Sequence, residues 1–227
     1  SLTPHKEEVL KIHGSLKRYI LNGWLKRKFM VLLNSSAHHI YWLGRYLMRI
    51  QFAVSHLPFT DDAKAAQFAA AFGLVIDQAE LLNCYMLDTK QTYSLLNQFA
   101  IAKDNIQELR GILSSNAYAE LNHAIKGVQA HPDSLKQALA KCNQILDAEH
   151  EDIALFLHLG QKIELFDIQL RFQQDLTQLL QELEQLLQQL NDLGWNKLTQ
   201  PWQLLKDHPN WEAYYNFTQQ LEYMFEA

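Results

Sequence analysis

Two stretches of the chain decide its fold: "IYWLGRYLMRIQF" at residues 40–52 and "FLHLGQKIELFDI" at residues 156–168. In both, apolar residues recur at every third or fourth position, which is the spacing of one buried helix face. The two stretches align without a gap, so that Ile40, Leu43, Gly44, Leu47 and Ile50 fall on Phe156, Leu159, Gly160, Ile163 and Phe166. The sequence therefore predicts two related helices and an internal pseudo-twofold repeat.

Gly44 and Gly160 occupy the same place in the two stretches. Glycine inside a helix costs about 1 kcal/mol relative to alanine, so its presence at matching positions needs a reason. One explanation is a close crossing, in which the backbones of the two helices touch. The alternative is that the missing side chain makes room for a ligand. We predict the close crossing.

Helical spacing and helix-capping residues extend over most of the remaining chain. We expect helices over about 37–57, 61–87, 92–113, 117–128, 132–147 and 152–193, the last of them continuous or bent, followed by two short elements bracketed by Pro201 and Pro209. No alternation of apolar and polar residues bounded by turn residues competes with helix. The sequence therefore predicts an all-α helical bundle, with residues 1–227 forming a single domain.

Composition excludes several classes of protein. A net charge of −5 argues against nucleic-acid binding, which requires a basic surface to neutralise phosphates. No run of 18 uncharged apolar residues is present, so we expect no membrane span. Cys84 and Cys142 have no partner at motif spacing, which is typical of reduced thiols, and we expect a cytoplasmic protein.

The first repeat belongs to a longer stretch with a recognisable pattern. "LNSSAHHIYWLGRYLMR", residues 33–49, resembles the opening motif of the bacterial alpha-E family, L-S-R-x-A-E-N-L-Y-W-L-G-R-Y-x-E-R-A-E. "AKDNIQELRGILSSNAYAELN", residues 102–122, and "FLHLGQKIELFD", residues 156–167, resemble the second and third blocks of that family. All three blocks occur in the family's order. The resemblance covers residues 33–167 and leaves a Leu/Gln-rich helix and an aromatic C-terminal cap at 168–227 without a match.

The resemblance implies a function as well as a helical fold. Alpha-E proteins are associated with ATP-grasp-type ligases, in systems thought to make or process small peptide-like amides. We therefore expect a partner or accessory subunit of an ATP-grasp-type amide or peptide ligase system. One alternative is an enzyme that acts on a small peptide-like substrate at the bundle centre. A second alternative is a di-metal carboxylate protein of ferritin-like type.

The resemblance also implies a polar centre. Six residues agree with polar positions of the family blocks: Arg45, Asp104, Asn105, Arg110, Glu164 and Asp167. Other positions differ, since His38, Met48 and Gln51 stand where the family has acids, and Gln161 and Leu165 stand where it has arginines. With half of the expected carboxylates missing, the resemblance implies a divergent, catalytically degenerate member, and no catalytic residue is assigned.

The charges of the two repeats are complementary. Glu164 and Asp167 are three residues apart and Arg45 and Arg49 are four apart, so each pair shares one side of its helix. If the two helices cross, one supplies positive charge and the other negative charge. Two interpretations remain open, a buried structural ion-pair network and a polar pocket for a zwitterionic, amino-acid-like ligand.

Metal-binding chemistry has little support. Glu120 with His123, and Asp147 with His150, have the three-residue spacing found in di-metal carboxylate bundles. Such pairs arise by chance in a chain with ten histidines. We therefore expect no metal and no other cofactor.

Two features indicate protein contacts. Leucines recur in heptad steps, and they form either part of the bundle core or the seam of a homodimer: Leu176, Leu179, Leu183, Leu186, Leu190 and Leu193. In the aromatic tail, Trp202 and Trp211 are the predicted partner-binding residues, since tryptophan often anchors interfaces. A basic amphipathic helix is also expected within residues 9–28, with a solvated charged face as its simplest interpretation.

Overall fold

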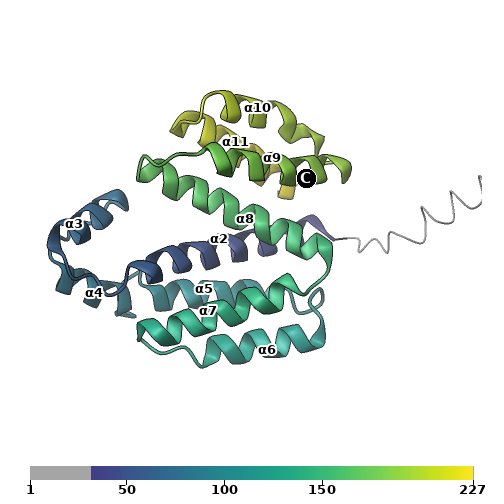
Figure 1. Cartoon of the computed structure of the whole chain (residues 1–227). Helices are drawn as coiled ribbons and strands as arrows, with labels where there is room; N and C mark the ends of the chain where they lie inside the picture. The colour runs from purple at the N-terminus through teal and green to yellow at the C-terminus, as the bar shows by residue number, and fades with distance from the viewer. Residues whose placement is uncertain (1–31, 227) are drawn as a thin grey trace, which may run out of the picture. The chain divides into compact units, whose positions relative to one another are not determined.

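The computed structural model describes residues 32–226 (Figure 1). All of the regular secondary structure in this range is helical. No β-strand occurs within that range, and the predicted all-α fold is confirmed. The expected basic helix at residues 9–28 lies outside the described residues. Within residues 32–226, none of the helices combines the length and the hydropathy needed to cross a membrane.

The helices follow one another through short connections. Their bounds are α2 (Asn34–His56), α3 (Asp62–Ala71), α4 (Ala79–Leu87), α5 (Leu95–Glu108), α6 (Ser115–Lys126), α7 (Pro132–Asp147), α8 (Glu151–Arg171), α9 (Thr177–Asp192), α10 (Thr199–Asp207) and α11 (Trp211–Glu226), with a 3₁₀ turn, η1 (Asn196–Leu198), before α10. The helix expected over 61–87 is wrong as a single element, because it is divided into α3 and α4. The segment expected over 152–193 is also divided, into α8 and α9.

Both divisions have the same physical cause, a residue in the left-handed backbone region after the last helical turn. Gly73 has a φ of 71°, and the backbone N–H of Leu74 donates to the carbonyl of Ala69 at 2.9 Å. Gln173 has a φ of 51°, and the N–H of Gln174 donates to the carbonyl of Gln169 at 2.9 Å. Each bond closes a Schellman-type C-cap, which ends the helix.

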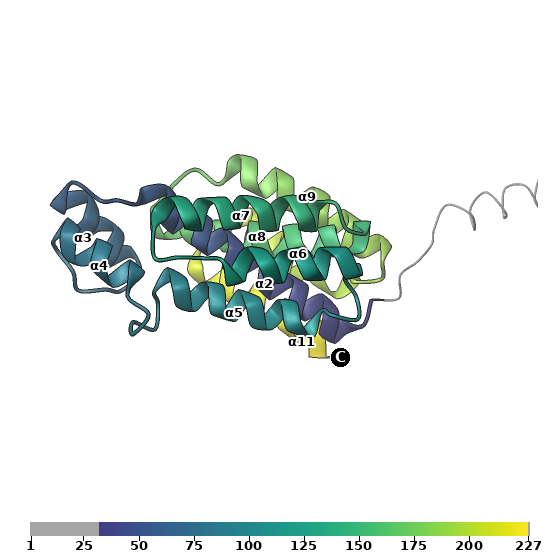
Figure 2. The same ribbon diagram turned by 90° about the horizontal axis from the view of Figure 1, so that it is seen from below.

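Helices α2 and α8 cross at the centre of residues 32–226 (Figure 1). Helices α5, α6 and α7 cover one side of this pair, as the view from below shows (Figure 2). Helices α9, α10 and α11 cover the other side, and the hairpin of α3 and α4 lies at one end. The two stretches that carry the sequence repeat therefore form the innermost pair of helices.

The crossing of α2 and α8 brings two backbones into contact at the glycines. A Cβ atom added to Gly44 would lie 2.2 Å from the carbonyl oxygen of Leu157, and one added to Gly160 would lie 1.9 Å from that of Tyr41. Both distances are far shorter than any real Cβ contact. The space beside each glycine is filled by the opposite helix, so it is not available to a ligand. The contact is reciprocal at this point, whereas a twofold relation across the whole bundle stays a prediction.

The leucine stripe of α9 is used within the chain. Leu179, Leu183, Leu187 and Leu190 are buried, and α9 packs against α8, α10 and η1. In the predicted stripe, Leu186 is half-buried and Leu193 is 38% exposed. The interior of the bundle therefore accounts for this stripe without a dimer seam.

Candidate functional site

A cavity of about 400 Å³ lies beside the crossing of α2 and α8. Its charged wall comes from these two helices: Arg45, Arg49, Glu164, Asp167 and Arg171. Apolar side chains form much of the remaining wall: Ala53, Phe68, Phe72, Leu74 and Met86. The cavity is therefore the place where the helix crossing, the α3–α4 end of the molecule and the aromatic helix α11 meet.

Glu164 is the centre of the charged wall. Its side chain is only 2% exposed and binds two arginines from α2. The Nε atom of Arg45 donates to Oε2 at 2.9 Å, while Arg49 donates through Nε to Oε1 at 2.6 Å and through Nη2 to Oε2 at 2.9 Å. Both carboxylate oxygens are thus occupied by charge-assisted hydrogen bonds.

Two tyrosines complete the surroundings of Arg45. Its Nη1 donates to the hydroxyl of Tyr41 at 3.4 Å, and its Nη2 donates to the hydroxyl of Tyr214 at 3.2 Å. The Tyr214 hydroxyl donates in turn to the backbone carbonyl of Ile163 at 3.3 Å, and its ring stacks on Phe166. Helix α11 is thereby connected to the charged pair at the crossing.

A second ion pair lies further along α8. Asp167 and Arg171 are one helical turn apart, and Arg171 donates to both carboxylate oxygens through Nε and Nη2. Its Nη1 donates to the carbonyl of Ala71 at 3.0 Å, and its guanidinium lies over the rings of Phe72 and Trp211. A cation therefore satisfies a carbonyl at the C-terminus of α3, where helix carbonyls lack intrahelical partners.

The surroundings fix the protonation states of this wall. Burial alone would raise the pKa of Glu164, but the charges and hydrogen bonds of Arg49 and Arg45 lower it below its ordinary value. Burial disfavours the charge of Arg45, yet the oxygens of Tyr41, Tyr214 and Glu164 raise the pKa of Arg45 overall. Burial also raises the pKa of Tyr41 to about 12 and raises that of Tyr214. At neutral pH the carboxylate and guanidinium groups are charged, and both phenols are neutral.

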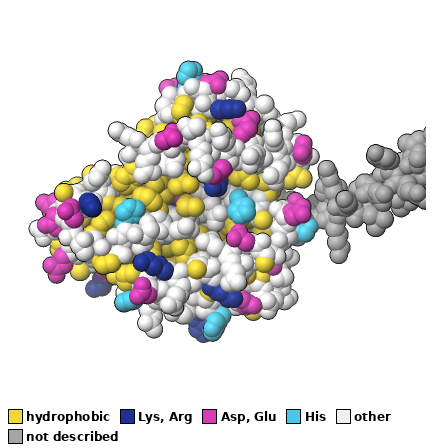
Figure 3. Space-filling model, viewed as in Figure 1, with side chains coloured by type: hydrophobic (Ala, Val, Ile, Leu, Met, Phe, Trp, Pro, Cys, Tyr) yellow, Lys and Arg dark blue, Asp and Glu magenta, His cyan; other side chains and the backbone are white. Residues whose placement is uncertain are grey.

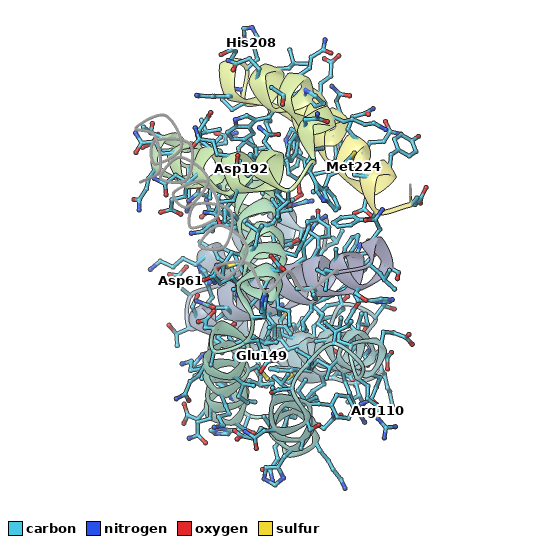
Figure 4. All side chains as sticks on the ribbon, turned by 90° about the vertical axis from the view of Figure 1, so that its right-hand side faces the viewer. Asp61, Arg110, Glu149, Asp192, His208 and Met224 are labelled. Atoms are coloured by element: carbon cyan, nitrogen blue, oxygen red, sulfur yellow. The ribbon has the colours of Figure 1, made fainter. Side chains whose placement is uncertain are left out.

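The structure brings together only half of the predicted polar centre. Arg45, Glu164 and Asp167 line the cavity. Asp104 and Arg110 are exposed, and Figure 4 shows Arg110 at the lower edge of the bundle, far from the end formed by α9 to α11.

Asn105 is half-buried and its Oδ1 lies 3.1 Å from Nδ1 of His39, so it too belongs to a different contact. Asp104 and Asn105 diverge from the centre because α5 buries its other side, through Leu95, Phe99, Ala102 and Ile106, and Arg110 lies beyond the end of α5 at Glu108. The expectation that all six polar residues converge is therefore wrong for the α5 block.

Arg171, Tyr214 and Gln98 are among the cavity residues that were not predicted as site residues from the sequence. Arg171 follows Asp167 by four residues, so the helical spacing rule could have identified it. Tyr214 was assigned only to the aromatic tail, and Gln98 had no distinguishing signal, because a single glutamine on an amphipathic helix is common.

The two predicted partner-binding tryptophans have different surroundings. Trp202 is 5% exposed, packs edge-on against Phe217 and donates through Nε1 to Glu184 at 2.9 Å. Trp202 is therefore a core residue of the α9–α11 layer and not a surface anchor. Trp211 is half-buried, stacks on Tyr215 and lies under Arg171 at the cavity margin.

The predicted metal-type pairs have other partners. Glu120 accepts from Asn116 at 2.9 Å and pairs with Lys141 at 2.8 Å, and Asp147 lies 3.1 Å from Nε2 of His158. Among residues 32–226, no group of three or more His, Cys, Asp and Glu side chains is placed to hold a metal ion. Burial raises the pKa of Cys142 to about 12, so this thiol is a poor nucleophile.

A known family profile matches most of the chain. The sequence profile of Alpha-E, described as a predicted alpha-helical domain with a conserved ER motif, matches residues 32–214. The chain belongs to the Alpha-E family. No curated protein and no solved structure shows significant similarity to it. The family match extends past residue 167, so it includes α9, α10 and the start of α11, which the three motif blocks did not reach.

This Alpha-E chain contains no Glu-Arg dipeptide. In the first repeat Arg49 follows Met48, and in the second Glu164 precedes Leu165, so each repeat keeps one half of the motif. The structure pairs these two halves across the crossing, with Arg49 bonded to both oxygens of Glu164. A Glu–Arg pair is therefore present in space although it is absent as a dipeptide.

Proposed function

We propose that this Alpha-E protein is an accessory, binding subunit of an ATP-grasp-type amide or peptide ligase system, and that its central cavity holds a small peptide-like molecule. The motif resemblance supports the association with a ligase. The departures at Met48 and Leu165 support a binding role over a catalytic one. The observation that carries the proposal is the fixed charge of the cavity wall.

General acid–base catalysis needs a group whose pKa lies near the working pH, so that it can both give and take a proton. In the cavity wall, the pKa of Glu164 is lowered while those of Arg45, Arg49 and Arg171 are raised. Each shift stabilises the charged form at neutral pH. Such groups orient and neutralise a ligand well, but they are poor proton donors or acceptors.

The cavity is also suited in size and lining to a small molecule. Its volume of about 400 Å³ falls within the range of about 300–1,000 Å³ that is typical of ligand pockets. Aromatic and aliphatic side chains share the lining with the charged groups. A compound with both a charged group and an apolar portion would contact both kinds of surface.

Purification of the tagged, full-length chain from its native host tests the proposed partner. An ATP-grasp-type ligase is expected to co-purify under conditions that preserve weak complexes, and added chain should increase its ATP-dependent amide formation. The variant Arg49→Gln should lose this stimulation, whereas the exposed Arg110→Gln removes the same charge and should keep it. Recovery of the chain alone, together with no effect on the ligase, would refute the proposal.

The purified protein also tests the two alternative functions, an enzyme acting on small peptide-like substrates and a di-metal carboxylate protein. An enzyme would turn over small peptide-like amides without the ligase. A di-metal protein would contain about two iron or manganese ions per chain. That metal would be lost from the Glu120→Ala and His123→Ala variants.

A further inference from the structure

The charges that line the central cavity do not cancel. Three arginines, Arg45, Arg49 and Arg171, face two carboxylates, Glu164 and Asp167, which leaves one positive charge in excess. Arginine nitrogens already occupy both oxygens of each carboxylate. No anionic oxygen of the wall is therefore left without a guanidinium partner, so a bound ammonium group would have no carboxylate of its own to neutralise it.

Arg49 is the arginine best placed to receive an anion. Arg45 uses Nε, Nη1 and Nη2 in hydrogen bonds, and Arg171 does the same. Arg49 directs only Nε and Nη2 at Glu164, and its Nη1 has no hydrogen-bond partner among residues 32–226. Its side chain is also 30% exposed, so that the free N–H groups can be reached.

A neutral acceptor lies in the same wall. Gln98 lines the cavity and is only 6% exposed. Its Nε2 donates to the carbonyl of Tyr93 at 3.1 Å, which fixes the orientation of the amide. Its Oε1 is buried and has no hydrogen-bond partner in the described part of the chain. A buried acceptor without a donor is unfavourable, so an N–H or O–H group of a bound molecule would stabilise this oxygen.

Other parts of the cavity lining are apolar. Phe68 and Phe72 contact each other, with ring centroids 5.0 Å apart, and Ala53, Leu74 and Met86 extend the surface. A ligand that matches all of the walls carries a single negative charge, a neutral hydrogen-bond donor and an apolar group.

We propose that the cavity binds the mono-anion of an N-acylated amino acid with an apolar side chain, such as the C-terminal residue of a short peptide-like amide. The carboxylate binds Arg49, the amide N–H donates to Oε1 of Gln98, and the side chain packs against Phe68 and Phe72. A free amino acid fits less well, because its ammonium group has no carboxylate left to bind. The proposed ligand is therefore a mono-anion and not the zwitterion that was one of the two interpretations left open by the sequence.

This inference rests on the proposed role of the cavity as a binding site and adds a position in a reaction sequence. The nitrogen of the ligand is already acylated when it binds. An amide-forming reaction must therefore supply the ligand, and the cavity holds a product or a growing intermediate of that reaction.

Isothermal titration of the purified, full-length chain with five probes tests the ligand class. The probes are N-acetyl-L-leucine, N-acetyl-L-leucinamide, L-leucine, 4-methylpentanoate and inorganic phosphate. N-acetyl-L-leucine should bind most tightly, and its neutral amide about 10- to 100-fold more weakly, as expected for the loss of a charged hydrogen bond. Equal or tighter binding of L-leucine or of phosphate would overturn the inference.

Two variants assign the contacts. Gln98→Leu should abolish the preference for N-acetyl-L-leucine over 4-methylpentanoate, which lacks the N–H group. Arg49→Gln should weaken both carboxylates about tenfold or more, and the matched surface variant Arg110→Gln should bind as the wild type does. An unchanged preference in a folded Gln98→Leu protein would overturn the contact with Gln98. If the Arg49 variant does not fold, the ranking of the probes on the wild-type chain still tests the proposed ligand class.

The outcomes separate this inference from the proposed function. Selective binding of N-acetyl-L-leucine without any associated ligase would support the ligand class and refute the ligase partner. A ligase that co-purifies with a chain showing no preference among the probes would support the partner and overturn the ligand class.

Discussion

The central crossing and helix α5 both carry residues from the Alpha-E motif blocks, yet they differ in what those residues contact. At the crossing, Arg45, Arg49 and Glu164 are bonded to one another in a largely buried cluster. Asp104 on α5 and Arg110, which follows the end of α5, are exposed, and the cation of Arg110 lies 5.9 Å from the ring centroid of Tyr118. The comparison shows that a polar motif residue forms a site only where its helix turns that residue towards the interior.

The outer surface also differs from the buried cluster in how its charges are arranged. On the face shown in Figure 3, charged side chains are scattered apart from an acidic group at the α3–α4 end, and hydrophobic side chains gather in the middle. This face presents no concentrated basic patch. The concentrated positive charge identified among the described residues is the arginine cluster of the cavity.

The largest difference between the two regions is expected for removal of one carboxylate charge. Glu164→Gln leaves two adjacent guanidinium groups without a counter-ion and should lower the free energy of unfolding by about 3–5 kcal/mol. Asp104→Asn, the matched change on α5, should alter it by less than about 0.5 kcal/mol. Urea denaturation followed by circular dichroism measures both, and equal effects would mean that the buried cluster is not structural.

The backbone contact at the crossing provides a second comparison. Gly160→Ala forces a methyl group against the carbonyl of Tyr41 and should destabilise the chain by about 3 kcal/mol, because neither helix backbone can move aside. Gly111→Ala is the control, since an added Cβ there meets nothing within 4 Å. A thermal melt in which both variants resemble the wild type would contradict the close approach of α2 and α8.

The pH dependence of stability tests whether the ionised carboxylate of Glu164 is the group that stabilises the fold. The folded state lowers the pKa of Glu164 below its ordinary value of 4.5, so the folded state favours the ionised form. This contribution is complete above the unfolded-state pKa and is lost as the pH falls through the folded-state pKa. The difference in unfolding free energy between wild type and Glu164→Gln should therefore shrink on acidification below about pH 4.5. Denaturation at pH 7 and at pH 3.5 would measure it, and a constant difference would exclude the charge as its cause.

The smallest effect is expected at the margin of the cavity. Arg171→Gln removes a partly exposed ion pair with Asp167 and should cost about 1 kcal/mol, because solvent screens such pairs. Arg110→Gln on the surface should be close to neutral. If Arg171→Gln destabilised the chain as much as Glu164→Gln does, solvent would be excluded from the cavity margin as fully as from the helix crossing.

Local sequence rules predicted the central helices well. Residue spacing identified the buried stripes of α2 and α8, and Pro132 marked the start of α7 at the residue where the structure begins it. The break between α8 and α9 could not be located, because the left-handed residue there is Gln173, whereas glycine usually occupies that position.

The candidate site was predictable only in part. Complementary charges on two repeated helices indicated that Arg45 and Glu164 would meet, and they do. The apolar wall could not be predicted, because the contact of Phe68 and Phe72 with the cavity depends on how the α3–α4 hairpin packs. The same limit applies to α5, whose rotation about its own axis was set by packing against α2 and not by its polar residues.

The charged cluster also constrains how the chain folds during synthesis. Arg49 and Glu164 are 115 residues apart, so α2 leaves the ribosome well before its counter-ion does. Until α8 appears, α2 has neither its main apolar partner nor the carboxylate that neutralises its arginines. Long-range contacts of this kind close late, because the intervening loop loses conformational entropy first. Nascent chains that end before residue 151 should consequently bind holdase chaperones, and release should coincide with the emergence of α8.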